Sequence, residues 1–248
     1  MSEPKTNTAV VISLNGADVI CNADGTALFD KGRMLVVSDL HLEKGKALSG
    51  TAALPHYDTD DTLAGLEAAV KTHQPERILF LGDSFHRSHL AEELGQEYRN
   101  RIEAMATGRE MIWIIGNHDP ALPDFLPGVA CPDYVTGGIW FRHIAQDPKD
   151  GPLHGGEVSG HYHPKVKIKT RARGVSGKCF IHDGMRLMMP AFGAYTGGLS
   201  VFNTAIARHF KEATPDRAKA AGAEGAEILF CHACQIYRYP YSQVIRNS

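Results

Sequence analysis

The chain of 248 residues lacks any apolar stretch long enough to cross a lipid bilayer, so it predicts no membrane span. Its first residues, MSEPKTNTAV, lack the basic and then apolar segments of a signal peptide. Five cysteines, an odd number without framework spacing, argue against a disulfide-stapled fold and indicate reduced thiols. The formal net charge of −2 excludes a polycation, so contact with nucleic acid would depend on a local basic patch. We therefore expect a cytoplasmic protein without membrane attachment.

The sequence contains enough apolar residues, 43% in total, for a substantial core. Its first half alternates β-rich runs with amphipathic segments, an order that predicts a parallel sheet with right-handed crossovers. The expected elements of this half are strands at 9–20, 33–38, 77–82 and 110–116 and helices at 59–73 and 89–107.

The sequence after residue 120 has a different pattern of apolar and turn-forming residues. Short β-rich runs joined by glycine-containing turns predict a second sheet, mixed or antiparallel. Its expected strands are 137–143, 157–160, 165–172, 178–183, 186–190 and a last one at 228–240. The polar, Ala/Gly-rich residues 211–226 are typical of a flexible surface segment. We expect a single domain over 1–248, because polar clusters from both halves must converge on one site.

Polar residues stand where three strands of the first half end. Asp39 and His41 follow MLVVS, Asp83 follows ILFLG, and Asn117 follows MIWIIG. Open α/β sheets bind ligands at the carboxyl ends of their strands. Alternation along an extended backbone would place Asp39 and His41 on one side. Gly82 would let the chain turn so that Asp83 faces the same cleft.

The GNHD motif at 116–119 combines three expected roles. Asn117 offers a neutral oxygen ligand, whereas the adjacent His118 points elsewhere and suits contact with a substrate. Asp119 would orient the His118 imidazole. The alternative is an ordinary turn, since Asn, Asp and Pro are all turn residues.

Histidines provide the remaining candidate ligands. His161 and His163, in SGHYHP, would lie on one side of an extended segment, so that one serves each of two metal ions. His143 and His154 compete for a further ligand position. His143 ends the apolar run GGIWFRH whereas His154 lies in a turn, which favours His143.

These candidate ligands exceed what a single metal ion needs, and a bridging Asp83 would make a two-metal site. Carboxylate, carboxamide and imidazole donors together suit borderline-hard divalent ions such as Mn²⁺, Fe²⁺ or Zn²⁺.

A basic segment follows the His161–His163 pair. Residues 165–178 contain six basic side chains and no acidic one, and Lys165, Lys167 and Lys169 would share one face of a strand. A phosphate backbone bound along that face would lead directly to the metal site, so DNA is an expected partner. The alternative is an edge strand whose lysines prevent pairing with other sheets.

Two further segments remain open to more than one interpretation. His86 and Arg87, just after the GD motif, would either reach a substrate phosphate or face solvent at the start of a helix. The CHAC sequence at 231–234 has the spacing of half a zinc site, but without a second cysteine pair we favour ordinary strand cysteines.

With Asp-x-His, GD, GNHD, a strand-end histidine and G-H-x-H in that order, residues 9–205 resemble the calcineurin-like metallophosphoesterase superfamily. The runs SDLHLEKG, LPHYDTDDTL, LGDSFH, GNHDP, SGHYHP, KCF and MPAFGAYTGGL are similar to its ligase-associated DNA-damage-response branch, the PdeM family. That bacterial family is encoded beside an ATP-dependent DNA ligase, a helicase and an exonuclease. The resemblance implies a four-layer α/β/β/α sandwich of two mixed sheets and Mn²⁺-supported phosphodiester hydrolysis in DNA repair.

The resemblance also implies how the ligands are divided between two metal ions. One ion would take Asp39, His41, Asp83 and His163, and the other would take Asp83, Asn117, His143 and His161. His118 would contact the phosphate and the leaving group. Many members have an acid where this chain has His86, so Asp119 is the candidate to support His118.

Three other functions fit parts of the pattern. A membrane-surface pyrophosphatase of lipid A synthesis shares SDLHL and a GDxF motif, but that family typically has Arg where His118 stands. A cyclic-nucleotide phosphodiesterase is a second alternative. A non-catalytic scaffold of the same fold would have lost ligands, and the complete set in this chain favours an enzyme.

Overall fold

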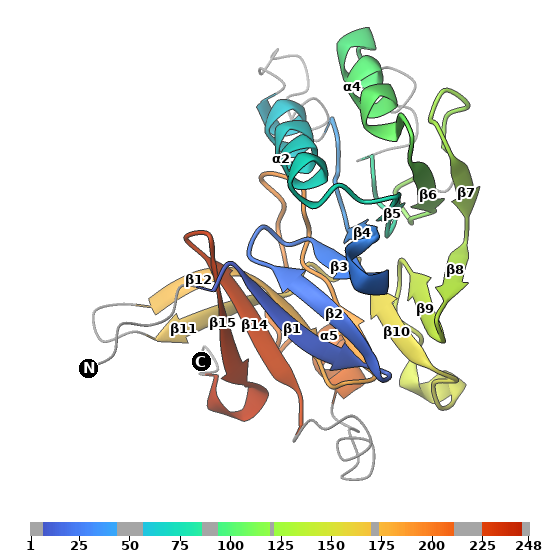
Figure 1. Ribbon diagram of the computed structural model, residues 1–248. Coiled ribbons are helices and arrows are strands. Elements are labelled where there is room, and N and C mark those ends of the chain that lie inside the picture. The colour runs from blue at the N-terminus through green and yellow to red at the C-terminus, as the bar shows by residue number, and fades with distance from the viewer. Residues whose placement is uncertain are drawn as a thin grey trace.

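The computed structural model describes residues 7–43, 57–85, 94–119, 122–169, 174–210 and 225–244. Within these ranges the strands form two sheets, and helices lie on the outer faces of both (Figure 1).

The first sheet consists of β1 (Ala9–Leu14), β2 (Ala17–Asn22), β3 (Ala27–Phe29), β4 (Met34–Val37), β5 (Arg77–Phe80), β6 (Glu110–Ile114) and β7 (Val129–Cys131), in that order. Strands β1 to β4 pair antiparallel, whereas β4 to β7 pair parallel. Apart from their first residues, β5 and β6 are buried throughout, and β4 is buried over its whole length. Such continuous apolar runs are typical of parallel strands covered on both faces.

The second sheet contains β8 (Asp133–Thr136), β9 (Ile139–Arg142), β10 (Gly156–Ser159), β11 (Lys165–Lys169), β12 (Gly174–His182), β13 (Arg186–Met188), β14 (Glu227–His232) and β15 (Gln235–Pro240). The main path runs β15-β14-β12-β13-β10-β9-β8, and β11 pairs with β12 off this path. Strand β10 is parallel to β9 and β13, while the other pairs are antiparallel, so this sheet is mixed as well.

Three hydrophobic clusters separate the layers. The helices are α2 (Tyr57–His73), α4 (Gln96–Ala106) and α5 (Thr204–Phe210), with short 3-10 turns at Asp30–Gly32, Pro148–Asp150 and Tyr241–Gln243. One cluster, including Leu79 and Phe141, fills the space between the two sheets. A second packs α2 and α4 on the first sheet (Figure 1), and a third packs α5 on the second. The expected four-layer α/β/β/α sandwich is therefore confirmed.

Several expected elements differ in detail. Residues 9–20 form two strands joined by a turn at Asn15 and Gly16, whose φ angles of 49° and 80° suit a hairpin turn of two residues. The expected last strand at 228–240 is also a hairpin, turning at Ala233 and Cys234 with φ angles of 49° and 57°. Strands β3, β7 and β8 and helix α5 were not expected. Helix α4 begins at Gln96, and the preceding Leu94 and Gly95 are not helical.

Some expectations fall on parts of the chain that are not described. Residues 211–224 of the expected flexible segment lie outside the described residues, and the single domain over 1–248 stays a prediction. None of the helices in the described ranges is long and apolar enough to span a membrane.

Candidate metal centre

Two adjacent groups of donor side chains lie at the carboxyl ends of strands from both sheets. Within each group, the donor atoms lie within 4.8 Å of one another. The first group is Asp39, His41 and His163, and the second is Asp83, His143 and His161. These six residues fall into the same two sets that the sequence resemblance implied, with one histidine of the G-H-x-H motif in each. The sharing of Asp83 by both sets, the membership of Asn117 in the second, and the binding of metal itself stay predictions.

The first group is held together by short contacts between donor atoms. Nε2 of His163 lies 3.1 Å from Oδ1 of Asp39 and 3.2 Å from Nε2 of His41. The backbone N–H of His161 donates to Oδ2 of Asp39 at 3.0 Å, and Ser38 donates its hydroxyl to the same carboxylate. Asp39 is completely buried, so protein groups and not solvent surround its charge.

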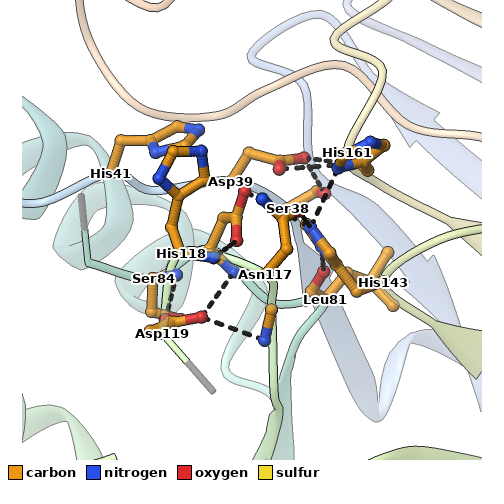
Figure 2. A network of polar contacts seen from close by, with 12 residues as sticks. Ser38, Asp39, His41, Leu81, Ser84, Asn117, His118, Asp119, His143 and His161 are labelled. Atoms are coloured by element: carbon orange, nitrogen blue, oxygen red, sulfur yellow. Dashed lines mark hydrogen bonds and ion pairs between the residues drawn. The ribbon is translucent and has the colours of Figure 1, made fainter. Parts of the chain in front are cut away.

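The second group is centred on His143. Its Nδ1 lies 2.7 Å from the carbonyl oxygen of Leu81. Because a carbonyl only accepts, Nδ1 carries a proton, so in the neutral imidazole the lone pair is on Nε2, which faces the site. That Nε2 lies 3.3 Å from Oδ2 of Asp83, 3.2 Å from Nδ1 of His161 and 3.0 Å from Oδ1 of Asn117 (Figure 2). The competing His154 is exposed, and the structure brings His143 into the group instead.

Backbone conformation, and not strand alternation, aims the donors. The φ angles are 53° at Asp39, 47° at His41, 48° at Asp83, 70° at His161 and 46° at His163. An extended backbone has negative φ, so our explanation by alternation in an extended segment was wrong. Left-handed conformations cost energy in residues other than glycine, and they are concentrated at functional sites.

Glycines allow the loops to approach closely. Gly82 has a φ of +81°, and a Cβ on it would lie 2.6 Å from Nδ1 of His143. A Cβ on Gly116 would lie 2.2 Å from Oδ1 of Asp83. Real Cβ atoms do not approach other atoms this closely, so any side chain at either position would displace a donor.

The pKa shifts differ among the donors of the site. Burial lowers the pKa of His143, but its hydrogen bond to Asp83 and the charges of Asp39 and Asp83 outweigh burial and raise it above the usual value. Burial opposes ionisation of Asp83, but the hydrogen bond and charge of His143 outweigh it and lower the pKa of Asp83 to about 2. Burial likewise opposes ionisation of Asp39, and its contact with His163 lowers the pKa below its usual value. Burial and then the charge of His143 lower the pKa of His161. Two ionised carboxylates and a neutral imidazole are the forms in which such residues bind metals.

Asp119 ties the GD and GNHD loops together. Its buried carboxylate accepts backbone N–H groups from Gly116 at 2.9 Å, Asp83 at 3.1 Å, Ser84 at 2.7 Å and Phe85 at 3.1 Å (Figure 2). Burial, with the nearby charge of Asp83, raises its pKa to about 6. Both carboxylate oxygens are thus used by backbone groups. The expected support of His118 by Asp119 stays a prediction.

His118 lies at the solvent edge of the first group. The residue is exposed, and its ring makes an edge-on contact with His41 at 5.5 Å between centroids (Figure 2). Its backbone N–H donates to Oδ1 of Asp83 at 2.9 Å, which fixes the backbone beside the donors. The imidazole is thus accessible to solvent next to a buried donor group, and its expected contact with substrate stays a prediction.

Sequence reasoning missed the buried polar network behind the histidine pair. Tyr162 lies between the two ligands, and its hydroxyl lies 3.2 Å from Nε2 of His209 on α5. Nδ1 of His209 lies 3.1 Å from Nη1 of Arg186, which also binds Oε2 of Glu157 at 2.8 Å. Burial, Arg186 and Arg208 lower the pKa of His209 to about 4. No local pattern around Tyr162 in SGHYHP links it to His209 or Arg186, which lie far along the chain.

A second missed contact anchors the Asp39 segment to helix α2. The backbone N–H of Glu43 donates to Oγ1 of Thr59 at 2.9 Å, and that hydroxyl lies 3.2 Å from Oε1 of Glu43. Glu43 is buried and has a φ of 63°.

The expected basic face is present on β11. Val166 and Ile168 are buried, so Lys165, Lys167 and Lys169 lie on the opposite face. Lys167 and Lys169 are exposed, whereas Lys165 is half-buried and donates to the carbonyl of Thr196 at 3.0 Å.

Of the two segments with more than one interpretation, the structure describes only the CHAC segment at 231–234. His86 and Arg87 lie outside the described residues. Within CHAC, Cys231 is buried on β14 and Cys234 is exposed in the hairpin turn. Neither cysteine belongs to a candidate metal-binding group among the described residues.

Comparison with solved structures shows the fold. A nuclease named MPE from Pseudomonas putida matches with a TM-score of 0.65 at 22% identity, over 93% of this chain and 100% of the other. Yfce, a phosphoesterase from E. coli, matches with a TM-score of 0.37 at 15% identity, over 67% of this chain and 83% of the other.

Comparison at the level of sequence shows the family. Among curated proteins, none matches the sequence significantly. The family model of the calcineurin-like phosphoesterases matches residues 32–184, which include every residue of the two donor groups. The matched region covers more than half of the chain and includes the whole candidate metal centre. The protein therefore belongs to the calcineurin-like phosphoesterase family.

Proposed function

We propose that this protein is a DNA phosphodiesterase of the nuclease type that works with two divalent metal ions, Mn²⁺ foremost. The observation that carries the proposal is the pair of adjacent donor groups, each with one carboxylate and two imidazoles. Such mixed oxygen and nitrogen donors suit Mn²⁺, and Fe²⁺ or Zn²⁺ as alternatives.

The donor set fits two ions better than one. Asp39, His41 and His163 would hold one ion, while Asp83, Asn117, His143 and His161 would hold the other, with Asp83 shared between both. When bound, a pair of divalent ions lowers the pKa of water and offsets the negative charge of a phosphate.

The protein's own residues contribute positioning and proton transfer. The Leu81 carbonyl fixes the tautomer of His143, and Asp119 fixes the loops that carry Asp83 and His118. In its protonated form His118 would donate a proton to the leaving-group oxygen. Its exposure lets a substrate reach the ring, whereas the donors behind it are mostly buried.

Three observations support DNA as the substrate. Exposed Lys167 and Lys169 lie on β11, which begins two residues after His163, so a phosphate backbone bound there leads to the site. The matching Pseudomonas structure is named a nuclease. The sequence resembles the ligase-associated DNA-damage-response family. On that resemblance we propose a role in DNA repair beside an ATP-dependent DNA ligase, a helicase and an exonuclease.

A substrate panel with added Mn²⁺ tests the proposal. It comprises single- and double-stranded DNA, RNA, a cyclic nucleotide and a nucleotide-lipid pyrophosphate. We expect cleavage of DNA that is lost with EDTA and restored by Mn²⁺. Faster hydrolysis of the cyclic nucleotide or the pyrophosphate would assign the site to small substrates. No hydrolysis of any substrate with metal loaded would favour a non-catalytic scaffold.

A further inference from the structure

The loop at 190–199 connects the two ligand-bearing segments. Four backbone hydrogen bonds hold it. At one end, the N–H of Phe192 donates to the carbonyl of Ser38 at 2.7 Å, and the N–H of Gly193 donates to the carbonyl of Asp39 at 3.1 Å. At the other end, the N–H of Leu199 donates to the carbonyl of Tyr162 at 3.4 Å, and the carbonyl of Leu199 accepts from the N–H of Lys165 at 2.8 Å. A fifth bond joins the N–H of Ala194 to Oγ1 of Thr62 on α2 at 2.9 Å. The loop is thus tied to the backbone of Asp39, to that of Tyr162 between His161 and His163, and to a helix.

Close backbone contacts leave the 190–199 loop little freedom. A Cβ on Gly193 would lie 2.0 Å from the carbonyl oxygen of Leu40. A Cβ on Gly198 would lie 2.3 Å from the carbonyl oxygen of His163. The two ends of the loop therefore pack directly on the backbone beside the first donor group.

Between these fixed ends, the loop presents Tyr195 to solvent. Its side chain is 74% exposed, the most exposed of the large hydrophobic residues in the described ranges. Its φ of 59° is a left-handed conformation that is unfavourable for tyrosine. Tyr195 is two residues from Gly193 and three from Gly198, so its Cα lies within about 7 Å and about 10 Å of theirs. Tyr195 is therefore an exposed residue on a loop whose backbone is anchored beside the first donor group.

The ammonium group of Lys165 binds the residue that follows Tyr195. Nζ of Lys165 donates to the carbonyl of Thr196 at 3.0 Å, and Thr196 in turn donates its hydroxyl to the carbonyl of Gly193 at 3.0 Å. The ammonium group is thereby fixed one residue from Tyr195. A rigid aromatic ring next to a fixed cation is the combination with which proteins hold a nucleotide, by stacking on the base and attracting the phosphate.

We infer that Tyr195 is a substrate-binding residue on which a nucleobase stacks next to the scissile phosphodiester. The inference rests on the proposed function and adds a base-contacting position to it. Stacking does not depend on base identity because every base has a π face. Tyr195 would therefore orient the nucleotide without imposing a sequence preference.

The test compares a labelled oligothymidylate with the same oligonucleotide carrying abasic sites. Binding is measured by fluorescence anisotropy in EDTA, which stops hydrolysis, and cleavage is measured separately with Mn²⁺. We expect Tyr195→Ala to weaken binding of the oligothymidylate about tenfold and to leave binding of the abasic oligonucleotide unchanged. Tyr195→Phe keeps the ring and should keep the parent affinity. Val11→Ala, at a 55% exposed position on the edge strand β1, is the control.

Equal affinity of Tyr195→Ala and the parent for the oligothymidylate would overturn the inference. An equal loss on both oligonucleotides would overturn it too, because the ring would then serve some other contact, such as a protein partner. If the parent shows base-dependent binding through Tyr195 but cleaves no DNA, the stacking contact stands, whereas the proposed function and the placement beside a scissile phosphodiester fail. If the parent cleaves DNA and Tyr195→Ala binds normally, the proposed function stands and the inference fails.

Discussion

Nε2 of His143 and Oδ1 of Asn117 lie 3.0 Å apart although the two residues follow strands of different sheets. Asn117 comes after β6 of the first sheet, and His143 comes directly after β9 of the second. The second donor group therefore exists only when the two sheets are packed face to face. Folding of the sandwich and assembly of the metal centre are in this sense one event.

Asp83 is predicted to be shared by two metal ions. We expect the metal-loaded protein to hold two ions about 3.5–4 Å apart. Asp83→Asn should lower the content of both, because the neutral amide removes a negative ligand from each. Metal analysis after dialysis measures this. A structure with one ion, or with Asp83 outside the coordination of both, would contradict the bridging role.

His118→Ala should separate chemistry from metal binding. The ring is exposed and is a member of neither donor group, so metal content should stay at the parent level. Turnover should fall about 10²- to 10⁴-fold through loss of the proton donor. Single-turnover cleavage and metal analysis on the same sample measure both. Loss of metal in this variant would show that His118 is a ligand.

Gly116→Ala should damage the site without any change of charge. The new methyl group would lie 2.2 Å from Oδ1 of Asp83, so the carboxylate or its loop must shift. We expect weaker metal binding and a loss of about 1–3 kcal/mol in the free energy of unfolding. Gly197→Ala is the matched control because no atom lies within 4 Å of its added Cβ. Equal metal affinity in the two variants would argue against close packing as the constraint.

Acid should destabilise the protein partly through His209. Burial, Arg186 and Arg208 lower its pKa in the folded state to about 4, against an ordinary value near 6.5. The unfolded chain therefore binds this proton first, and stability present above about pH 6.5 is lost as the pH falls toward 4. The shift corresponds to about 3 kcal/mol at most. Urea unfolding of the parent and of His209→Asn at pH 7 and pH 4.5 should show a smaller pH-dependent loss in the variant.

The basic face of β11 should set the salt dependence of DNA binding. Replacing Lys165, Lys167 and Lys169 with Ala should flatten the slope of log affinity against log salt by about one unit for each lost phosphate contact. Because Lys167 and Lys169 are exposed and Lys165 is half-buried, we expect the two exposed lysines to account for most of the slope and Lys165 for a smaller part. Lys71→Ala on α2 is the exposed control. An unchanged slope in the triple variant would assign these lysines to solubility.

The residue pattern alone was enough to predict the buried strands of the first sheet and the types of donor side chain that follow them. Apolar runs such as MLVV and MIWI bury both faces only in a covered parallel sheet, and this predicted β4 and β6. The donors were recognisable because Asp, His and Asn stood at the ends of those runs. The Asn15-Gly16 hairpin was also readable, since Asn-Gly is the strongest short hairpin signal, although we expected a single strand there.

The grouping and the direction of the donors depend on contacts between distant segments, which no local pattern could predict. The apolar run before His143 already favoured it over His154, but only the packing of the two sheets brings it together with Asp83. The left-handed backbone of the loops sets the direction of Asp39 and His163. Local propensity disfavours such conformations, so no local pattern announces them. The Ala233-Cys234 turn likewise has no sequence signal and follows from the pairing of β14 with β15. Residue types determine which donors exist, and long-range packing determines where they meet.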